Sequence, residues 1–566
     1  MRNIELFRDY ENAKLTTAQE YMASHGDTTV YFHELGEREV DGIPICFARG
    51  EDGLLKATFI PDTHLLAIGA TRSGKTTGYV IPTMNILLRK KNKPSMVISD
   101  PKQELYRSNA KKFEEMGYRV LLLDFTNYLH SDCWNPLTKY YRAYQEHLKV
   151  EAAVEVVETP KGLRSRFQGV IYEDQTALDR AVAMAKEAYL DEVEKGITAL
   201  AGAVLPTTNT KDPFWEDSAR DLLMALLYGM LEDSAKGLVT EETFSFDTVL
   251  RIFDGFSDSA REYDGGYFTR RSIKTSHAHQ LARKCIIEQA NNTRRCISSA
   301  FAAKMNKFRD TAVRRVTSAN TFEIRTLDDG APTVIFVSFK DEESLHYEVI
   351  SMFLSNLYTE LIAAARSKGT RLQRPFYFLL DEFGNLPPFN DFDKVISACA
   401  GRNIWFLLIL QSYAQLNNVY GQATAEIIKD NLNTHIFFGT NNPQTKLEFS
   451  EECGRKTIIS PVSALNGEGE TVARYEKDTV ALVPVSALTK LAPGECIVTQ
   501  MREDVLWSWF ERSYTCPEFD GEPAEPCQRG INRVFSDARY VYDDKPAADE
   551  LDIVDEMFLF GDEEDE

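Results

Sequence analysis

Short runs of consecutive apolar residues recur in two separate stretches of this chain. The first stretch contains HLLAIGA, PSMVISD and YRVLLLDF, between residues 64 and 125. The second contains PTVIFVSF, FYFLLDEF, IWFLLILQS and THIFFGTNN, between residues 332 and 442. Runs of this length indicate strands that are buried on both faces, and segments with helical periodicity separate them. This alternation predicts an α/β fold in which helices cover a parallel sheet.

A stretch with a different pattern separates the two sets of strands. From about residue 140 to residue 318, nearly every segment has helical periodicity, as in YYRAYQEHLKVEAAVEVV (140–157) and WEDSARDLLMALLYGMLED (215–233). The simplest interpretation is one α/β domain that is interrupted by an all-α insertion. No apolar run approaches the about 18 to 20 residues that a membrane span requires.

The segment GATRSGKT lies between the first apolar run and the helix that follows it. Its two glycines allow a tight turn, so that backbone N–H groups can approach phosphate oxygens. Lys75 can reach the β- and γ-phosphates, and Thr76 can offer its hydroxyl to Mg²⁺. This pattern predicts an ATP and Mg²⁺ site. The predicted nucleotide-binding residues are Gly69, Ala70, Thr71, Arg72, Ser73, Gly74, Lys75, Thr76 and Thr77.

The run FYFLLDEF ends in two carboxylates that extend this chemistry. Asp381 is placed to hold the Mg²⁺ shell, as the Walker B aspartate does in P-loop NTPases. Glu382 follows directly and can accept a proton from an attacking water. The alternative is that the two acids merely end a strand at the surface. The segment GATRSGKT (residues 69–76), called the phosphate loop below, lies earlier in the chain and favours the catalytic interpretation. This interpretation predicts ATP hydrolysis.

Two further strand ends carry polar residues. The run IWFLLILQS ends in Gln411, whose amide can hydrogen-bond the attacking water or the γ-phosphate. The alternative is an ordinary polar residue at a strand exit. Asp100 and Lys102 follow another apolar run, where ligands bind in sheets of this kind. A role in the site and a place on the surface fit these two residues equally well.

About three hundred residues separate the phosphate loop from LLDEF, which favours a polymer substrate or a large ring over a compact kinase. We divide the chain accordingly. The predicted parts are an N-terminal entry region (1–60), two parts of a nucleotide-binding domain (61–140 and 319–515), the all-α insertion (141–318) and an acidic tail (516–566) that is disordered when alone.

Charge is distributed unevenly along the chain, whose formal net charge is −22. Residues 268–316, called the basic block below, carry twelve Lys or Arg against two acids. The block can neutralise DNA phosphates without reading the base sequence, and its first candidates are Arg294, Arg295, Arg314 and Arg315. The alternative is a solvated helix face whose cations pair with acids elsewhere in the protein.

The acidic tail combines charge with apolar residues. Residues 543–566 carry twelve acids and one lysine. The apolar residues among them are Leu551, Ile553, Val554, Met557, Phe558, Leu559 and Phe560. Segments of this type can dock on a basic partner and become ordered on binding. The alternative is a tail that only aids solubility.

Read in order, several segments resemble the type IV secretion coupling proteins of conjugation systems. The resemblance covers about residues 60–515 and rests on GATRSGKTTGYVIP, VISDPKQEL, WNPL, DPFWEDSARDLL, LLDEFGNLP, LILQSYAQLNNVYG and IFFGTNN. Each short segment is weak alone, but their shared order is specific. The resemblance implies a RecA-like P-loop NTPase domain with an inserted all-α domain, in a homo-hexamer that hydrolyses ATP between subunits.

The resemblance also implies a function and partners. The family delivers a relaxase-bound DNA strand to a secretion channel, and the catalytic candidates match the family's positions: Lys75, Thr76, Asp381, Glu382 and Gln411. The implied partners are single- or double-stranded DNA, relaxosome proteins through the acidic tail, and the secretion channel. Ring ATPases also need an arginine from the neighbouring subunit. Arg402 and Arg455 are the candidates, and Arg402 is preferred.

Two features depart from the family pattern. Many members begin with two membrane helices, which this sequence does not show. Either the chain is a shortened form or a separate anchor protein holds it, and we expect the second. That places the protein in the cytoplasm, peripheral at the inner face of the cell membrane. Gln103 stands where the family commonly has glycine, which leaves the local backbone conformation open.

Two classes of function compete at this point. The first is a DNA-stimulated ATPase that drives transfer of the relaxase–DNA complex. The second is a docking platform, in which ATP assembles the ring while other ATPases move the strand. A septal-type DNA translocase is a further alternative, which the absence of a winged-helix end in the sequence disfavours.

Overall fold

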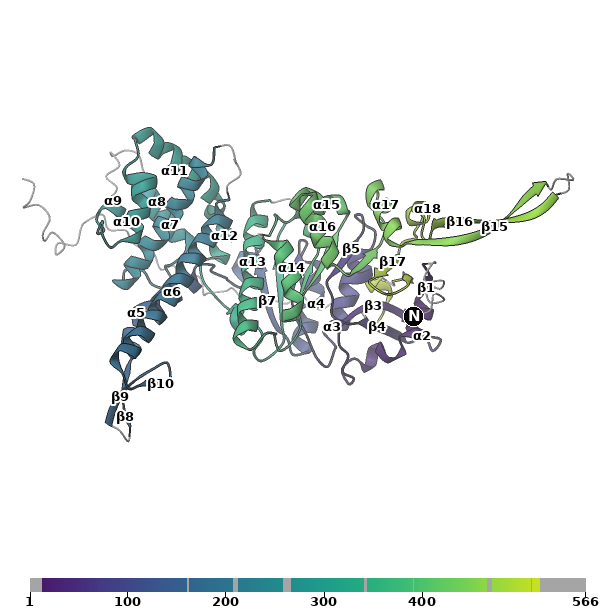
Figure 1. The fold of residues 1–566 in the computed structure, drawn as a ribbon, viewed down its shortest axis with the longest axis horizontal. Coiled ribbons are helices and arrows are strands. Elements are labelled where there is room, and N and C mark those ends of the chain that lie inside the picture. The colour runs from purple at the N-terminus through teal and green to yellow at the C-terminus, as the bar shows by residue number, and fades with distance from the viewer. Residues whose placement is uncertain are drawn as a thin grey trace, which may run out of the picture. The chain divides into compact units, whose positions relative to one another are not determined.

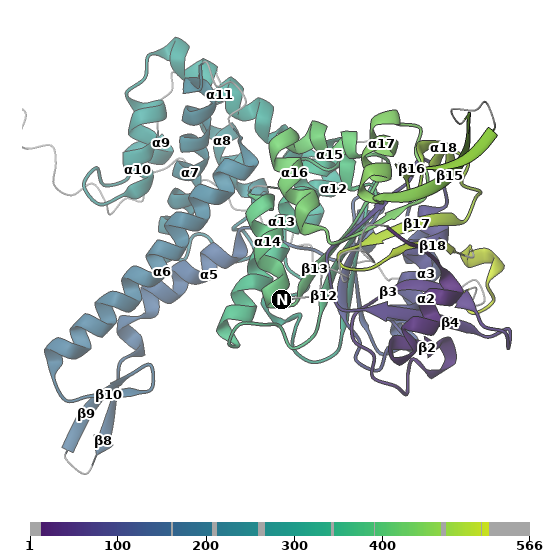
Figure 2. The same ribbon diagram turned by 45° about the vertical axis from the view of Figure 1, so that its right-hand side comes forward.

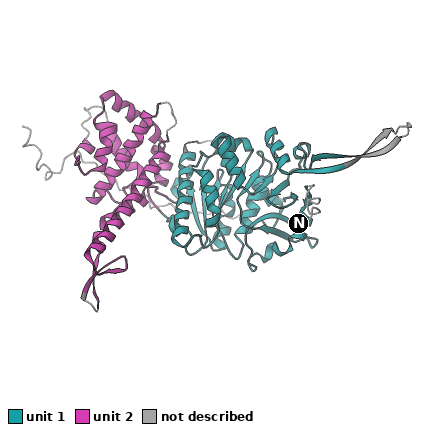
Figure 3. Cartoon of the chain, in the orientation of Figure 1, with its two compact units in different colours: residues 1–132, 321–532 teal, residues 133–320, 533–566 magenta. Residues whose placement is uncertain are grey.

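The computed structural model describes residues 13–159, 162–206, 212–257, 266–340, 344–389, 391–465, 471–510 and 512–519. They form two compact units (Figure 3). Unit 1 combines the residues before 133 with those from 321 onward, and unit 2 contains residues 133–320. The chain therefore leaves unit 1, builds unit 2 and returns, which is the topology of an inserted domain. The apolar residues predicted to dock from the acidic tail lie outside the described residues.

The centre of unit 1 is a ten-stranded sheet with the order β1-β18-β17-β14-β5-β13-β12-β6-β11-β7. Its parallel part, in sheet order, is β14 (Thr434–Phe437), β5 (Leu65–Ile68), β13 (Ile404–Leu410), β12 (Phe376–Leu380), β6 (Ser95–Asp100), β11 (Thr333–Ser338) and β7 (Arg119–Asp124). These strands coincide with the apolar runs of the sequence, and every residue of β5, β12 and β13 is buried. The predicted α/β fold is therefore confirmed.

Three strands extend this sheet at its other edge. They are β17 (Glu495–Gln500), β18 (Val505–Trp509) and β1 (Leu15–Thr17). β17 is antiparallel to β14 and to β18, whereas β1 is parallel to β18. The N-terminal residues thus belong to the main sheet of unit 1, although they are far from β18 in the sequence.

Helices cover both faces of the sheet. On one face, η3 (Thr76–Val80), α3 (Ile81–Leu87) and α4 (Glu104–Glu115) share a core with a small sheet of β2 (Thr29–Tyr31), β4 (Leu55–Ile60) and β3 (Ile43–Arg49). On the other side of β12 and β13 lie α13 (Ser344–Ser367), α14 (Phe392–Cys399), α15 (Tyr413–Tyr420) and α16 (Gln422–Asn431) (Figure 2). The sheet is therefore the middle layer, which explains why its strands are apolar on both faces.

A long antiparallel ribbon extends from unit 1 (Figure 1). β15 (Arg455–Leu465) pairs with β16 (Thr471–Ala481) from Arg455 opposite Ala481 to Leu465 opposite Thr471. α17 (Pro443–Glu452) precedes the ribbon and α18 (Val485–Thr489) follows it. The ribbon was not predicted from the sequence, because its apolar and polar residues do not alternate regularly. Among the helices in the described ranges, none has the length and apolar character needed to cross a bilayer.

Unit 2 is mainly helical, as the resemblance implied. Its helices are α5 (Thr138–Lys149), α6 (Gln175–Val204), α7 (Phe214–Ala235), α8 (Phe246–Ser257), α9 (Gly266–Thr269), α10 (His277–Ala282), α11 (Asn291–Met305) and α12 (Thr311–Val316). A small antiparallel sheet of β8 (Glu155–Thr159), β9 (Gly162–Phe167) and β10 (Val170–Tyr172) lies between α5 and α6 along the chain. The predicted insertion therefore contains strands as well as helices.

The small sheet corrects the expectation that residues 140–157 form one helix. The helix ends at Lys149, and residues 155–159 form a strand. The β-branched side chains of Val156 and Val157 favour an extended backbone there. Gln168 and Gly169 both have positive φ angles and form the two-residue turn between β9 and β10. Such a turn is typical of a β-hairpin, and it was the signal available in the sequence.

Candidate functional site

The strand order of unit 1 brings the predicted nucleotide residues together at one end of the parallel strands, where these strands have their carboxyl ends. The phosphate loop follows β5, Gln411 follows β13, Asp381 follows β12, and Asp100 ends β6. These four strands are consecutive neighbours and all are parallel. Their carboxyl ends therefore meet, although Thr76 and Asp381 are separated by 305 positions in the sequence.

The backbone of the phosphate loop is held at its base by the two strands that flank β5. The Gly69 N–H donates to the Leu410 carbonyl at 2.9 Å, and the Ala70 N–H donates to the Gly439 carbonyl at 2.7 Å. A Cβ atom at Gly69 would lie 2.3 Å from the Ser73 Oγ atom, so a side chain there would displace the loop. Gly74 has a φ of +100°, in the region that L residues rarely adopt.

Lys75 is buried in this loop without a hydrogen bond. Its Nζ atom is 3.8 Å from Glu382 Oε1, and neither this Nζ nor the buried Ser73 Oγ has a hydrogen-bond partner among the described residues. Burial lowers the pKa of Lys75, while Glu382 and Asp381 oppose the shift. A buried cation and hydroxyl without partners fit a phosphate group that would supply the missing acceptors.

Thr76 and Asp381 lie in direct contact. The Thr76 hydroxyl donates to Asp381 Oδ2 at 3.0 Å. Burial raises the pKa of Asp381, although Lys75 acts in the opposite direction. A hydroxyl and a carboxylate are hard oxygen ligands of the kind that Mg²⁺ prefers. These two residues would hold Mg²⁺, whose positive charge would compensate the cost of ionising a buried carboxyl.

Glu382 occupies a strained backbone position next to Gln411. Its φ and ψ are 53° and 37°, the left-handed region that costs a non-glycine residue about 1 to 2 kcal/mol. The Gln411 Nε2–H group donates to Glu382 Oε2 at 3.0 Å. The Thr440 hydroxyl donates to the Gln411 carbonyl at 2.9 Å. The structure thus brings together the candidate base, the candidate sensor and Thr440, a residue that the sequence analysis did not identify.

The carboxylate of Asp100 caps a helix, a role that was not predicted from the sequence. Its carboxylate accepts N–H groups from Leu105 and Tyr106 at 3.3 and 2.8 Å, and so it caps the start of α4. Burial raises the pKa of Asp100 to about 7, against the effect of these hydrogen bonds. Lys102 is exposed, and its charge contributes to lowering the pKa of Lys75. Lys102 is therefore the better candidate for a direct role at the phosphates.

The backbone at Gln103 resolves the question that its sequence position raised. Its φ and ψ are 58° and 11°, so this position has the left-handed conformation that glycine adopts without strain. The Gln103 Nε2–H group donates to Asp124 Oδ2 at 2.7 Å, and the Gln103 Oε1 atom accepts from Arg107 at 2.9 Å. The hydrogen bonds of the Gln103 side chain therefore stabilise a backbone conformation that glycine would adopt without strain.

The two candidates for an arginine acting in trans lie elsewhere in unit 1. Arg402 precedes β13, whereas the nucleotide residues follow the carboxyl ends of the strands. A strand of this length spans roughly 23 Å, so Arg402 cannot reach the site of its own chain. Arg455 is exposed at the start of β15. A trans role for either residue stays a prediction.

The basic block contains ion-paired cations and exposed cations, and Arg283 and Arg309 belong to both groups. In unit 2, Arg271 binds Asp233 through both terminal nitrogens at 2.8 Å, and both side chains are almost fully buried. Lys304 pairs with Glu216, Arg309 with Asp254 and Arg314 with Asp247. By contrast, Lys274, Lys284 and Arg295 are exposed. The structure thus assigns several of these cations to the folding of unit 2.

The four arginines predicted to contact DNA differ in their surroundings. Arg294 is half-buried and donates to the carbonyl groups of Gln289 and Ile287. Arg314 pairs with Asp247 at 3.7 Å, and Arg315 is half-buried. Arg295 is the exposed one of the four. It is the member of this group with the greatest access to a phosphate.

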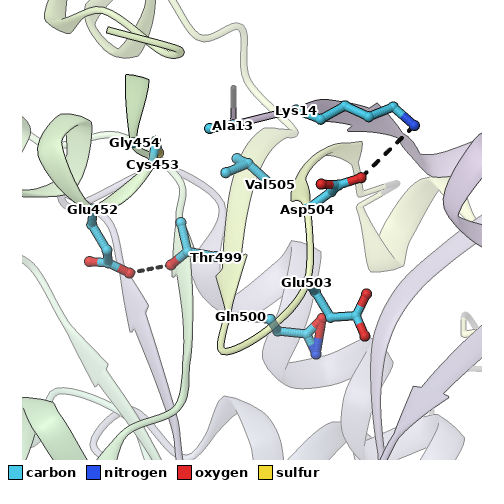
Figure 4. A pocket seen from close by; sticks show the side chains of 10 residues that line it. All are labelled: Ala13, Lys14, Glu452, Cys453, Gly454, Thr499, Gln500, Glu503, Asp504 and Val505. Carbon is cyan, nitrogen blue, oxygen red and sulfur yellow. Dashed lines mark hydrogen bonds and ion pairs between the residues drawn. The ribbon is translucent and has the colours of Figure 1, made fainter. Parts of the chain in front are cut away.

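A cavity of about 220 Å³ opens beside β1, β17 and β18, the strands at one lateral edge of the main sheet (Figure 4). Its lining contains Ala13, Lys14, Glu452, Cys453, Gly454, Thr499, Gln500, Glu503, Asp504 and Val505. Glu452, one of these lining residues, accepts hydrogen bonds from Tyr413 and Thr499 and pairs with His435. Burial would raise the pKa of Glu452, but the bonds from these partners hold it below its usual value. The lining does not include the phosphate loop.

Comparison with known proteins places this geometry in context. Residues 9–476 match the family described as Type IV secretory system Conjugative DNA transfer. Protein VirD4 of Agrobacterium fabrum is 21% identical over 404 residues, which are 70% of this chain and 50% of VirD4. Coupling protein TraD of Escherichia coli is 25% identical over 316 residues, which are 53% of this chain and 40% of TraD. The chain thus spans about half the length of these curated relatives.

Solved structures show the same fold. The bacterial conjugative coupling protein TrwBdeltaN70 has a TM-score of 0.53 at 14% identity, over 79% of this chain and 85% of that protein. TrwB in complex with ADP and Mg²⁺ also has a TM-score of 0.53, at 15% identity, over 85% of this chain and 93% of that protein. These likenesses confirm the expected fold, a RecA-like α/β domain with a helical insertion.

Proposed function

This chain belongs to the type IV secretory family of conjugative DNA transfer proteins, and we propose that it is the coupling ATPase of such a system. The observation that carries the proposal is the meeting of three elements at one sheet edge. The phosphate loop provides Lys75, β12 provides the Asp381–Glu382 pair, and β13 provides Gln411. A nucleotide platform without hydrolysis would need the loop but not a carboxylate beside a sensor amide.

Each residue has a defined part in the proposed hydrolysis. The loop N–H groups and Lys75 neutralise the β- and γ-phosphates, and Thr76 and Asp381 hold the metal. Bound Mg²⁺ supplies charge stabilisation at the phosphate oxygens. Glu382 accepts the proton of the attacking water, because its carboxylate is half-buried and lies beside Lys75. Gln411 orients Glu382 or the water through its amide.

The proposed substrate side follows from the family and from the charges of unit 2. The exposed cations of the basic block contact DNA phosphates, and the acidic tail recruits relaxase or another relaxosome protein. The active form is a homo-hexamer in which Arg402 or Arg455 completes the neighbouring site. The place of action is the inner face of the cell membrane, at the secretion channel and through a separate anchor protein.

The test separates a motor from a platform. ATP turnover is measured with the full chain alone, with single-stranded DNA and with duplex DNA. The proposal expects DNA to raise turnover, and Glu382→Gln to abolish both turnover and conjugative transfer in cells. Turnover that stays flat across all DNA additions, together with normal transfer by Glu382→Gln, would overturn the motor and leave the platform.

A matched variant tests the proposed role of the tail. Truncation after Ala548 is expected to abolish capture of relaxosome proteins while ATP turnover of the chain is kept. Capture that is unchanged in a pulldown contradicts recruitment through the tail, without affecting the ATPase proposal.

A further inference from the structure

Gln415 lies in the first turn of α15, four residues after Gln411. Its Oε1 atom accepts the backbone N–H of Gln411 at 2.8 Å. The Gln411 carbonyl is held separately by the Thr440 hydroxyl. Both polar groups of the Gln411 backbone are therefore bound by side chains, which fixes the direction in which its own side chain leaves the strand end.

Gln415 also packs directly on the turn that follows Glu382. A Cβ atom at Gly384 would lie 2.8 Å from Gln415 Cβ and Cδ and 2.9 Å from its Oε1. Gly384 has no unusual φ that would itself require glycine. The lack of a side chain at this position is therefore explained by the close approach of Gln415. One glutamine thus contacts both the Gln411 backbone and the turn that carries Glu382.

Glu382 needs such support because its backbone is strained. A non-glycine residue in the left-handed region persists only where its surroundings hold it. Within the described structure, the Glu382 carboxylate is directed by the Gln411 amide at 3.0 Å and by Lys75 at 3.8 Å. Any rotation of the Gln411 backbone would move that amide and thereby redirect the carboxylate.

We propose that Gln415 is a positioning residue for ATP hydrolysis, which acts by locking Gln411 and the Gly384 turn in the arrangement that directs the Glu382 carboxylate. This inference rests on the proposed ATPase function. Gln415 does not contact the phosphate loop through any of these bonds, so it affects the hydrolytic step and not nucleotide binding. An error of about 1 Å in the position of a catalytic group can cost on the order of 10²-fold in rate.

The first experiment compares two substitutions of similar size in the full chain. Gln415→Met removes the acceptor, and we expect kcat to fall by about tenfold or more while KM for ATP and nucleotide affinity stay within about twofold. Gln415→Glu keeps an acceptor oxygen at the same position and is expected to retain most of the activity. Gln422→Met, at an exposed position in α16, is the matched control.

The second experiment uses the contact with Gly384. Gly384→Ala is expected to lower kcat as Gln415→Met does, because the added methyl displaces Gln415. In the double variant Gly384→Ala/Gln415→Gly no side chain is left at position 415 to collide with the added methyl, so its kcat should equal that of Gln415→Gly alone. Gly401→Ala is the control, since no atom lies within 4 Å of a Cβ there.

The outcomes separate this inference from the proposed function. Absence of turnover in the unaltered chain would overturn the ATPase proposal itself. Turnover in the unaltered chain with a normal kcat in Gln415→Met would overturn only the positioning role. Equal losses in Gln415→Met and Gln415→Glu, or a fall in thermal stability that accounts for the lost activity, would also overturn it, because the acceptor oxygen would then be irrelevant.

Discussion

The proposed nucleotide site of unit 1 and the basic block of unit 2 show opposite relations between distance in the sequence and distance in space. In the nucleotide site, residues about three hundred positions apart come within hydrogen-bond distance, as Thr76 and Asp381 do. In the basic block, cations that are close in the sequence are separated in function. Arg271 is buried against Asp233, Arg309 pairs with Asp254, and Arg295 stays exposed.

The difference shows what each kind of sequence signal contains. A motif at a strand end marks a position in a parallel sheet, and neighbouring strands bring such positions together. A run of like charges shows only the composition of a segment. Some of its cations form ion pairs that stabilise the fold, and others are exposed to solvent. The predictions below test whether the two regions differ in this way.

The largest expected effect concerns the buried acid of the nucleotide site. Asp381→Asn should lower ATP turnover by about 10²-fold or more, since metal-borne charge stabilisation is worth several kcal/mol. The same change should raise the melting temperature of the nucleotide-free protein, because burial disfavours the ionised carboxyl and raises its pKa. Turnover assays and thermal unfolding measure the two effects. A variant that loses stability together with activity would indicate that Asp381 is structural.

The second effect concerns the cations of unit 2 that serve folding. Arg271→Ala leaves Asp233 charged and buried, which should cost about 3 to 5 kcal/mol of unfolding free energy. The control Arg283→Ala breaks an ion pair with Glu288 in which both side chains are exposed. That loss should be about 0 to 1 kcal/mol. Equal losses in denaturant unfolding would remove the distinction between buried and exposed cations.

The third effect is the pH dependence of stability that Asp100 causes. Its pKa is raised to about 7 by burial, so the folded protein binds more protons at this group than the unfolded chain does. Stability should therefore decrease as pH rises from about 4 to about 7. Asp100→Asn should remove most of this decrease, which is on the order of 3 kcal/mol for a pKa raised from about 4 to about 7, because an amide does not titrate. Unfolding free energies measured at several pH values test this, and unchanged curves would contradict it.

The smallest effect concerns the exposed cations. The triple change Lys274→Ala/Lys284→Ala/Arg295→Ala should weaken DNA binding about tenfold and reduce the slope of log affinity against log salt by about 2 to 3. Arg309→Ala removes one charge that is already paired with Asp254 and should leave that slope almost unchanged. Titrations at several salt concentrations measure both. A larger change in Arg309→Ala than in the triple variant would reverse the assignment.

Several parts of the fold were predictable because the signal was local. The apolar runs became the parallel strands, since a strand covered on both faces must be apolar throughout. The helix expected at 140–157 was wrong in its second half, where two valines and the turn at Gln168 and Gly169 build a hairpin. The strand propensity of the valines and the residues of the turn determined the structure of this segment, although its apolar residues have a helical spacing.

Other features of the site depend on partners that the sequence does not place. The pattern VISDPK indicated that Asp100 ends a strand, but the carboxylate caps α4. Gln103 takes a left-handed conformation that only its position between β6 and α4 explains. Gln415 carried no signal beyond its spacing from Gln411, because its contacts involve Gly384 on another strand end.

The sequence by itself determined which chemistry this protein can offer: a phosphate loop, two carboxylates and a glutamine, each at the end of an apolar run. It did so because strand formation and loop conformation depend on neighbouring residues. Only the tertiary structure decided how these groups act together. The order of the strands set the 3.0 Å bond between Gln411 and Glu382, and packing decided which cations of unit 2 are neutralised. Contacts across long separations arise from packing, and no local pattern encodes them.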